Sequence, residues 1–106
     1  MAWSLEGFFL RERKCALDII IEMGLLGAQP VRIPMEQNYR LALSTRKLLA
    51  DPEPCHRLVG RLIYLCFTRP ELSYSVHILS QFMQRPRKDH WQAALWVVRY
   101  LKYSPG

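Results

Sequence analysis

The sequence predicts a mainly α-helical protein, with a short N-terminal strand and three helices in its C-terminal half. Two observations carry this prediction. Apolar residues recur at helical spacing in three stretches after residue 54. Prolines stand at the boundaries of these stretches, where they can begin or end a helix. The chain has 106 residues, 50% of them hydrophobic, so it can form one core but not two, and it is one domain or one piece of a larger domain.

The first segment, residues 1–27, is predicted to hold a strand followed by a helix. Residues 8–10 are apolar and aromatic, which favours a short strand or a remnant of a hairpin. Residues 14–24 carry a broad apolar stripe that indicates a helix, with Gly24 and Gly27 suited to its end. Three charged residues share the opposite face of this helix, namely Lys14, Asp18 and Glu22.

The second segment, residues 28–54, is predicted to be a long extended connection. It contains Pro30, Pro34, Pro52 and Pro54. It shows no sustained periodicity, and one short element is expected at residues 39–43. A connection of roughly 25 residues is long for a compact domain, which predicts that it is functional or covers a surface of a larger protein.

The third segment, residues 55–106, is predicted to form a three-helix module. The first of these helices begins near Pro54 and has an apolar stripe made of Leu58, Leu62 and Leu65, widened by Val59, Ile63 and Cys66. Residues 68–71 have the composition of a capping box, in which Thr68 caps the next helix and Glu71 reaches back. One helix should therefore end here and the next begin.

The two remaining helices follow the same pattern. The second ends before Pro86, and its apolar face is Leu72, Val76, Leu79 and Met83. The third runs from about Lys88 to Lys102, and its apolar face is Trp91, Leu95, Val98 and Leu101. A second stripe of the third helix, roughly 140° away, consists of Trp96, Tyr100 and Tyr103. One small core cannot bury both stripes, so the aromatic stripe should either pack on a partner domain or be exposed for stacking on bases.

The positive charge lies in the second half of the chain. Residues 1–53 carry seven basic and seven acidic side chains, whereas residues 54–106 carry eight basic side chains against Glu71 and Asp89. This asymmetry indicates a polyanionic partner, with an ordinary solvated surface as the alternative. The candidates for contact with nucleic acid are Arg57, Arg61, Arg85, Arg87, Lys88, Arg99 and Lys102. Contacts from such side chains to phosphates would be sensitive to salt and tolerant of sequence.

The sequence offers no site for catalysis, for a metal ion or for a cofactor. It lacks the GxGxxG, Walker A and GxSxG motifs. Cys55 and His56 are adjacent, so their side chains point in different directions and do not form a catalytic pair. The spacing also does not fit a zinc site of the finger type, because Cys55, Cys66, His77 and His90 are separated by ten or more residues, and the other candidate ligands are Cys15 and His56.

The expected location is inside a cell, in a compartment that the sequence does not predict. No stretch approaches the roughly 20 apolar residues that span a bilayer, so no membrane contact is expected. The first residues do not resemble a secretory signal, and three cysteines without such a signal are expected to be reduced thiols.

The chain resembles the reverse transcriptase region of Ty1/copia-type retrotransposon polyproteins, which are abundant in plants. The resemblance covers residues 5–106 and is carried, in order, by EGFFLRERKCALDII, GLLGAQPVRIPMEQN, RLVGRLIYL, TRPELSYSVHILSQFMQ, PRKDHWQAAL and VVRYLKYSPG. Four positions depart from the pattern of the family. Cys15 and Cys55 stand in place of tyrosine, Glu71 in place of aspartate, and Tyr103 in place of glycine.

The resemblance implies a thumb-like helical bundle from the thumb and connection part of an RNA-directed DNA polymerase. This part would grip an RNA–DNA or DNA duplex and would contact the palm and RNase H domains. The magnesium-binding carboxylates of the polymerase and those of RNase H would lie before Gly7 and after Gly106, so the chain is expected to be a truncated fragment without catalysis of its own. The alternatives are a free-standing helical protein-interaction module and a relic without a selected function.

Overall fold

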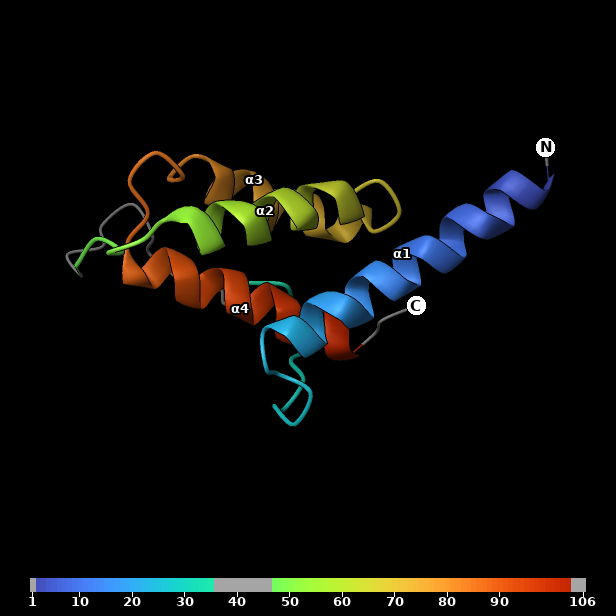
Figure 1. Cartoon of the computed structure of the whole chain (residues 1–106), viewed down its shortest axis with the longest axis horizontal. Coiled ribbons are helices and arrows are strands. Elements are labelled where there is room, and N and C mark those ends of the chain that lie inside the picture. The colour runs from blue at the N-terminus through green and yellow to red at the C-terminus, as the bar shows by residue number, and fades with distance from the viewer. Residues whose placement is uncertain (1, 36–46, 104–106) are drawn as a thin grey trace.

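The computed structural model describes residues 2–35 and 47–103, and this part of the chain is mainly helical. Figure 1 shows its elements in chain order, which are α1 (Ala2–Glu22), α2 (Glu53–Leu65), the short 3₁₀ helix η2 (Pro70–Leu72), α3 (Ser73–Ser80) and α4 (Lys88–Tyr103). The predicted fold class is therefore confirmed. Among the described helices, none is both long enough and apolar enough to cross a bilayer.

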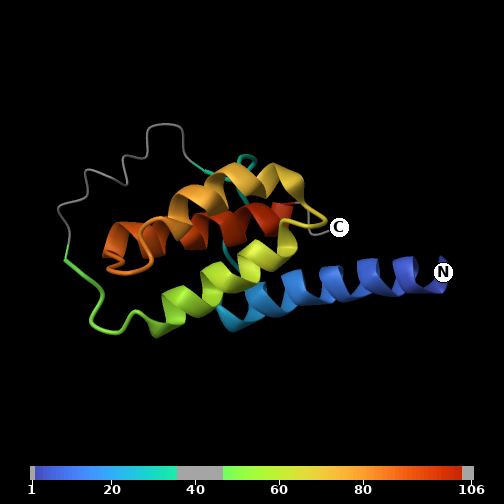
Figure 2. The ribbon, with the colours of Figure 1, turned by 90° about the horizontal axis from the view of Figure 1, so that it is seen from above.

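The helices share one core. Helices α2, α3 and α4 pack on one another, and α1 packs on α4 and α2 through its C-terminal half. The N-terminal half of α1 extends past the other helices (Figure 2). The core side chains come from every helix and include Ile19, Ile20, Leu58, Leu62, Leu65, Leu72, Val76, Leu79, Val97, Val98 and Leu101. Burial of these side chains from water is the main stabilising contribution to the bundle.

The predicted strand at residues 8–10 is wrong, because these residues belong to α1. A strand needs a neighbouring strand to pair its backbone N–H and C=O groups, and the described residues offer it none. A helix pairs these groups within its own segment. The predicted helix over residues 14–24 is confirmed as the second half of α1.

The end of α1 is built around Gly24, which has a φ of 70°. The N–H of Leu25 donates to the carbonyl of Ile20 at 3.0 Å, and that of Gly24 donates to the carbonyl of Ile21 at 3.0 Å. This pair of bonds is the Schellman motif, which favours glycine at the left-handed position. The chain then turns back, and the N–H of Val31 reaches the carbonyl of Arg99 on α4 at 3.4 Å.

The predicted capping box at residues 68–71 does not form. Arg69 occupies the N-cap position of η2, without a side-chain cap bond. The hydroxyl of Thr68 instead donates to Glu12 Oε2 at 3.0 Å, and Glu71 Oε1 accepts from Arg69 Nε at 3.1 Å. Glu12 is 5% exposed and needs a donor, so a long-range partner takes the hydroxyl that local sequence assigns to the cap.

Two further predictions change in detail. The helix expected to run to Pro86 ends as α3 at Ser80, and turns follow it. In α4 the fully buried positions include Ala93, Ala94 and Val97, whereas Trp91 and Leu95 are only partly buried. The buried face of α4 is thus rotated, relative to the predicted one, toward smaller side chains. Small side chains allow α4 to pack closely against the neighbouring helices. The short element expected at residues 39–43 lies outside the described residues.

Candidate functional site

Basic residues gather at the end of the bundle where α2 and α4 begin. The backbone of residues 47–49 runs antiparallel to that of residues 86–88, with a β-bridge between Leu48 and Arg87. The N–H of Leu49 donates to the carbonyl of Pro86 at 2.9 Å, and that of Lys88 donates to the carbonyl of Lys47 at 3.1 Å. This pairing holds two basic segments together that are about 40 residues apart in the sequence.

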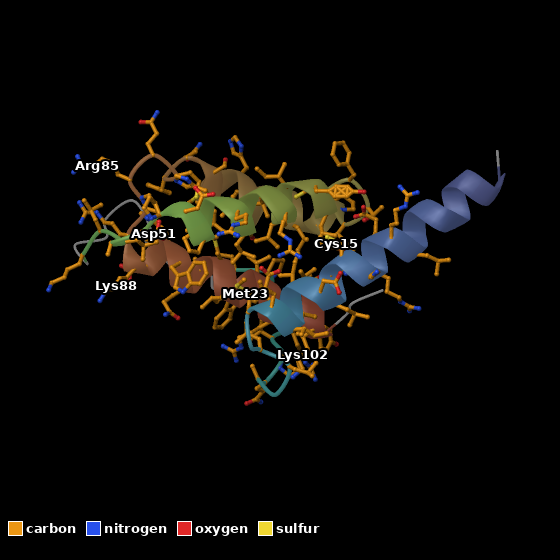
Figure 3. The ribbon with its side chains drawn as sticks, viewed as in Figure 1. Cys15, Met23, Asp51, Arg85, Lys88 and Lys102 are labelled. Atoms are coloured by element: carbon orange, nitrogen blue, oxygen red, sulfur yellow. The ribbon has the colours of Figure 1, made fainter. Side chains whose placement is uncertain are left out.

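Helix α2 contributes to the same end of the molecule. The ring nitrogen Nε2 of His56 hydrogen-bonds the carbonyl of Met83, in the turn that precedes Arg85. The next residue of α2 is Arg57, whose side chain is exposed. We use the name basic corner for the set Lys47, Arg57, Arg85, Arg87 and Lys88. Figure 3 shows Arg85 and Lys88 at this end of the molecule.

Most of the basic corner is accessible to a partner. Lys47, Arg57, Arg85 and Lys88 are exposed, and Arg87 is half-buried. The corner also contains negative charge, since Asp51 lies at the same end (Figure 3). Asp51 Oδ1 accepts the N–H of Glu53 at 3.1 Å, so this carboxylate serves the start of α2. The corner thus presents several exposed cations from separate backbone segments at one end of the bundle.

The buried side chain of His90 positions the backbone at the start of α4, within the basic corner. Its side chain is 2% exposed, and its Nδ1 accepts the N–H of Arg87 at 2.8 Å. The ring stacks on Phe82 with centroids 4.4 Å apart and an interplanar angle of 13°. His90 thereby supplies the start of α4 with a reciprocal cap bond of the kind usually made by Glu or Gln.

Sequence reasoning missed two of these residues. Lys47 was not among the predicted contacts, because it lies in the connection and reaches the corner only through long-range backbone pairing. His90 was considered only as a metal ligand. Its spacing of three residues from Arg87, at the start of a helix, was the available signal for a capping role.

Three of the predicted contact residues lie elsewhere and hold parts of the fold together. Arg61 makes an ion pair with Glu22 and so joins α2 to α1. Arg99 Nε donates to the carbonyl of Gln29 at 2.8 Å. Lys102 Nζ donates to the carbonyl of Ala28 at 2.5 Å and also to those of Leu25 and Leu26. Arg99 and Lys102 therefore fasten the turn after α1 onto α4.

The second aromatic stripe of α4 is partly covered by this chain itself. Trp96 Nε1 donates to the carbonyl of Ile33 at 2.9 Å, and the Arg99 guanidinium lies 5.4 Å from the Trp96 ring centroid. Tyr100 is half-buried, and the guanidinium of Arg69 lies 5.7 Å from its ring centroid. Tyr103 is 51% exposed, with Arg32 at 5.9 Å from its ring. All three aromatic side chains thus have intramolecular partners that sequence reasoning did not foresee, although Tyr103 stays largely exposed.

The nucleophilic and metal-binding side chains are dispersed. Within the described ranges, no three of the His, Cys, Asp and Glu side chains come together as metal ligands would. Cys55 is buried, and burial raises the pKa of its thiol to about 11, so the thiol is protonated at neutral pH. Its Sγ faces Met83 Sδ at 3.9 Å, while the His56 ring turns to the Met83 carbonyl.

The chain is similar to polyproteins of plant transposons. It is 43% identical over 100 residues to the retrovirus-related Pol polyprotein from transposon RE2 of Arabidopsis thaliana. It is 40% identical over 100 residues to the retrovirus-related Pol polyprotein from transposon RE1 of the same plant. Each alignment covers 94% of this chain and 7% of the polyprotein, so the chain spans a small part of these relatives.

A shorter relative is an uncharacterized mitochondrial protein of Arabidopsis thaliana. It is 35% identical over 97 residues, which are 92% of this chain and 40% of that protein. No protein-family model matches the chain, and no solved structure matches it significantly.

Proposed function

We propose that this chain comes from the thumb and connection part of a reverse transcriptase and contacts a primer–template duplex. The chain is a homologue of one segment of the copia-type, retrovirus-related Pol polyproteins of transposons, and this homology supports the proposal. Its partners would be an RNA–DNA or DNA duplex and, within a polyprotein, the palm and RNase H domains. The observation that supports duplex binding best is the basic corner, in which exposed cations from α2, the connection and the start of α4 share one end of the bundle.

The geometry of the corner suits phosphates better than bases. Arg and Lys side chains on separate backbone segments can each meet a different phosphate, which positions a duplex without reading its sequence. We expect Lys47, Arg57, Arg85 and Lys88 to make these contacts because they are exposed. Arg61, Arg99 and Lys102 are expected to act indirectly, through the intramolecular bonds that they already make.

We expect no polymerisation by this chain alone. Two-metal phosphoryl transfer needs clustered carboxylates that hold two cations about 4 Å apart. The described carboxylates do not cluster in this way. The magnesium-binding residues of a polymerase that uses this module would come from another part of the polyprotein.

Duplex binding can be tested by fluorescence anisotropy with a labelled RNA–DNA hybrid of about 20 base pairs at several salt concentrations. The triple variant Arg57→Glu, Arg85→Glu, Lys88→Glu should weaken binding at least tenfold. The slope of log affinity against log salt concentration should also decrease in magnitude, by roughly one for each phosphate contact that the variant loses. The matched control is Arg11→Glu, Arg13→Glu, Lys14→Glu, which changes the net charge equally on the exposed side of α1.

The control variant should change the affinity only by the general effect of net charge. Equal loss of binding in both variants would overturn the assignment to the basic corner. A folded wild-type chain that binds no duplex even at low salt would overturn the proposal and favour a protein-interaction module or a relic.

A further inference from the structure

Helix α1 has a second apolar stripe, roughly 130° around the helix from the face that packs on the core. The core face contains Ala16, Ile19 and Ile20, each at most 2% exposed. On the outer side, Leu10, Leu17 and Ile21 are 62%, 40% and 58% exposed. These three residues are separated by seven and four positions, which places them on one narrow stripe of a helix. We name them the outer stripe.

Nothing in the described part of the chain covers the outer stripe. Figure 2 shows α1 along one edge of the molecule, with the other helices on its opposite side only. Isolated exposed apolar residues are common, but three that line up along a helix that already has a core face are more typical of a contact surface.

The charges beside the stripe indicate what covers it. Lys14 and Asp18 are exposed and border the stripe on the same side, one turn apart. Arg11 lies on that side nearer the N-terminus, so the border is basic toward the N-terminus and acidic at Asp18, whereas Glu22 is already paired with Arg61 of α2. A helix with this border is complementary to itself when the second helix runs in the opposite direction.

The apolar and charged positions agree on one register. Lys14 and Asp18 lie at equal distances from residue 16, and Leu10 and Ile21 lie at equal distances from a point between residues 15 and 16. An antiparallel pair centred there brings Lys14 of each copy to Asp18 of the other and Leu10 to Ile21. A parallel twofold pair would place the charged borders of the two copies on opposite sides of the interface, so Lys14 and Asp18 of one copy would not meet those of the other.

We propose that the outer stripe of α1 is a self-association surface, on which a second copy of the chain packs its own α1 in antiparallel orientation. The interface is isologous, as expected of a twofold dimer. Three apolar side chains from each copy bury less area than the roughly 1,200 Å² of a stable complex, so the dimer is expected to be weak.

The test is sedimentation equilibrium of the full chain from about 10 μM to 1 mM, with variants that alter only exposed charges. In Lys14→Glu, positions 14 and 18 are both acidic. In Asp18→Lys, both positions are basic. Each variant alone should be monomeric, because like charges face each other in the homodimer. An equimolar mixture should form the heterodimer at least as tightly as the wild type forms its dimer.

A third variant, Leu17→Gln, should abolish association of the wild type without changing the circular dichroism spectrum, because Leu17 lies outside the core. Wild-type chain that is monomeric at 1 mM would overturn the proposal and leave the stripe to another partner. Association that survives both charge variants equally, or a mixture that stays monomeric, would overturn the antiparallel register.

Discussion

Glu12 joins α1 to the segment that follows α2. Its carboxylate is 5% exposed and accepts the Thr68 hydroxyl at 3.0 Å. The same carboxylate raises the pKa of the Tyr64 phenol above its usual value, through hydrogen bonding and its negative charge. The other oxygen of Glu12, Oε1, is buried without a hydrogen-bond partner, so the carboxylate depends on the Thr68 hydroxyl, and this contact holds α1 in place along α2.

Replacing Thr68 by Val removes the donor and keeps the shape of the side chain. The free energy of unfolding should fall by about 1 to 3 kcal/mol, because Glu12 Oε2 is left buried without that donor. Urea denaturation of Thr68→Val measures the loss. In the background Glu12→Gln the same substitution should cost less, and an equal cost in both backgrounds would show that the hydroxyl does not act through Glu12.

The buried thiol of Cys55 predicts a fall in stability at alkaline pH. Its pKa is about 11 in the folded protein, against 9.0 for an ordinary thiol. The unfolded chain therefore loses this proton first, and the stabilising effect is complete below pH 9 and is lost as the pH rises toward 11. The loss approaches about 1.4 kcal/mol per pH unit in this window.

Denaturation at pH 8, 9 and 10 checks this dependence, with Cys55→Ala as the comparison. The variant is expected to be less stable at pH 8 because of its cavity, but with a flatter pH dependence. Iodoacetamide should also modify Cys55 more slowly than the half-buried Cys66. Equal rates at the two thiols would contradict the burial of Cys55.

The turn that ends α1 depends on one glycine, and the chain offers a matched comparison. A Cβ added at Gly24 or at Gly27 would meet no atom within 4 Å, but only Gly24 has a positive φ, of 70°. Gly24→Ala should cost about 1 kcal/mol from the left-handed backbone alone. Gly27→Ala should stay within about 0.5 kcal/mol of the wild type, as measured by thermal denaturation. A similar cost at both positions would mean that the backbone angle is not the cause.

Helices α2, α3 and α4 could be predicted because their signals are local. Leu58, Leu62 and Leu65 follow helical spacing, and all three are buried as expected. The short apolar run at residues 8–10 failed for the opposite reason, since such a run fits a strand and a helix equally well. Its length does not decide between them, and the absence of a pairing strand among the described residues does.

The predictions at helix ends were weaker, because partners from distant segments compete for the same polar groups. Thr68 could cap the next helix, but it donates to Glu12, which lies 56 residues earlier. Trp96 was expected to pack on a partner domain or to be exposed, and Arg99 to contact nucleic acid, but the two side chains bond the carbonyls of Ile33 and Gln29. Nothing in the local sequence of α4 indicates that residues 25–35 return to cover it.

At the level of the whole molecule, sequence reasoning identified the charged residues but not their grouping. Arg85, Arg87 and Lys88 are close in sequence and stay together in the structure. Lys47 joins them only because its backbone pairs with that of Lys88. Arg61 does not belong to this group, because it makes an ion pair with Glu22 of α1, and a count of charges in the sequence does not reveal that pair.

A single core shared by four helices predicts a single unfolding transition. Circular dichroism at 222 nm should show a sigmoidal and reversible melt of the isolated chain. Leu62→Ala should lower the free energy of unfolding by about 2 to 5 kcal/mol, because Leu62 is fully buried in the core. A shallow and non-cooperative decline of the wild type would show instead that the helices need a further domain to pack against.

The packing of α1 on α4 also sets an order for folding. Its contacts join residues that lie roughly 80 positions apart, about twice the separation within α2, α3 and α4, so closing them costs more chain entropy, by about 0.6 kcal/mol for each doubling of the loop. The three later helices are therefore expected to form the folding nucleus, and α1 to dock after the rate-limiting step. Substitutions at Ile19 or Ile20 should then accelerate unfolding and leave the rate of refolding nearly unchanged, which gives the N-terminal helix control over how long the folded state lasts.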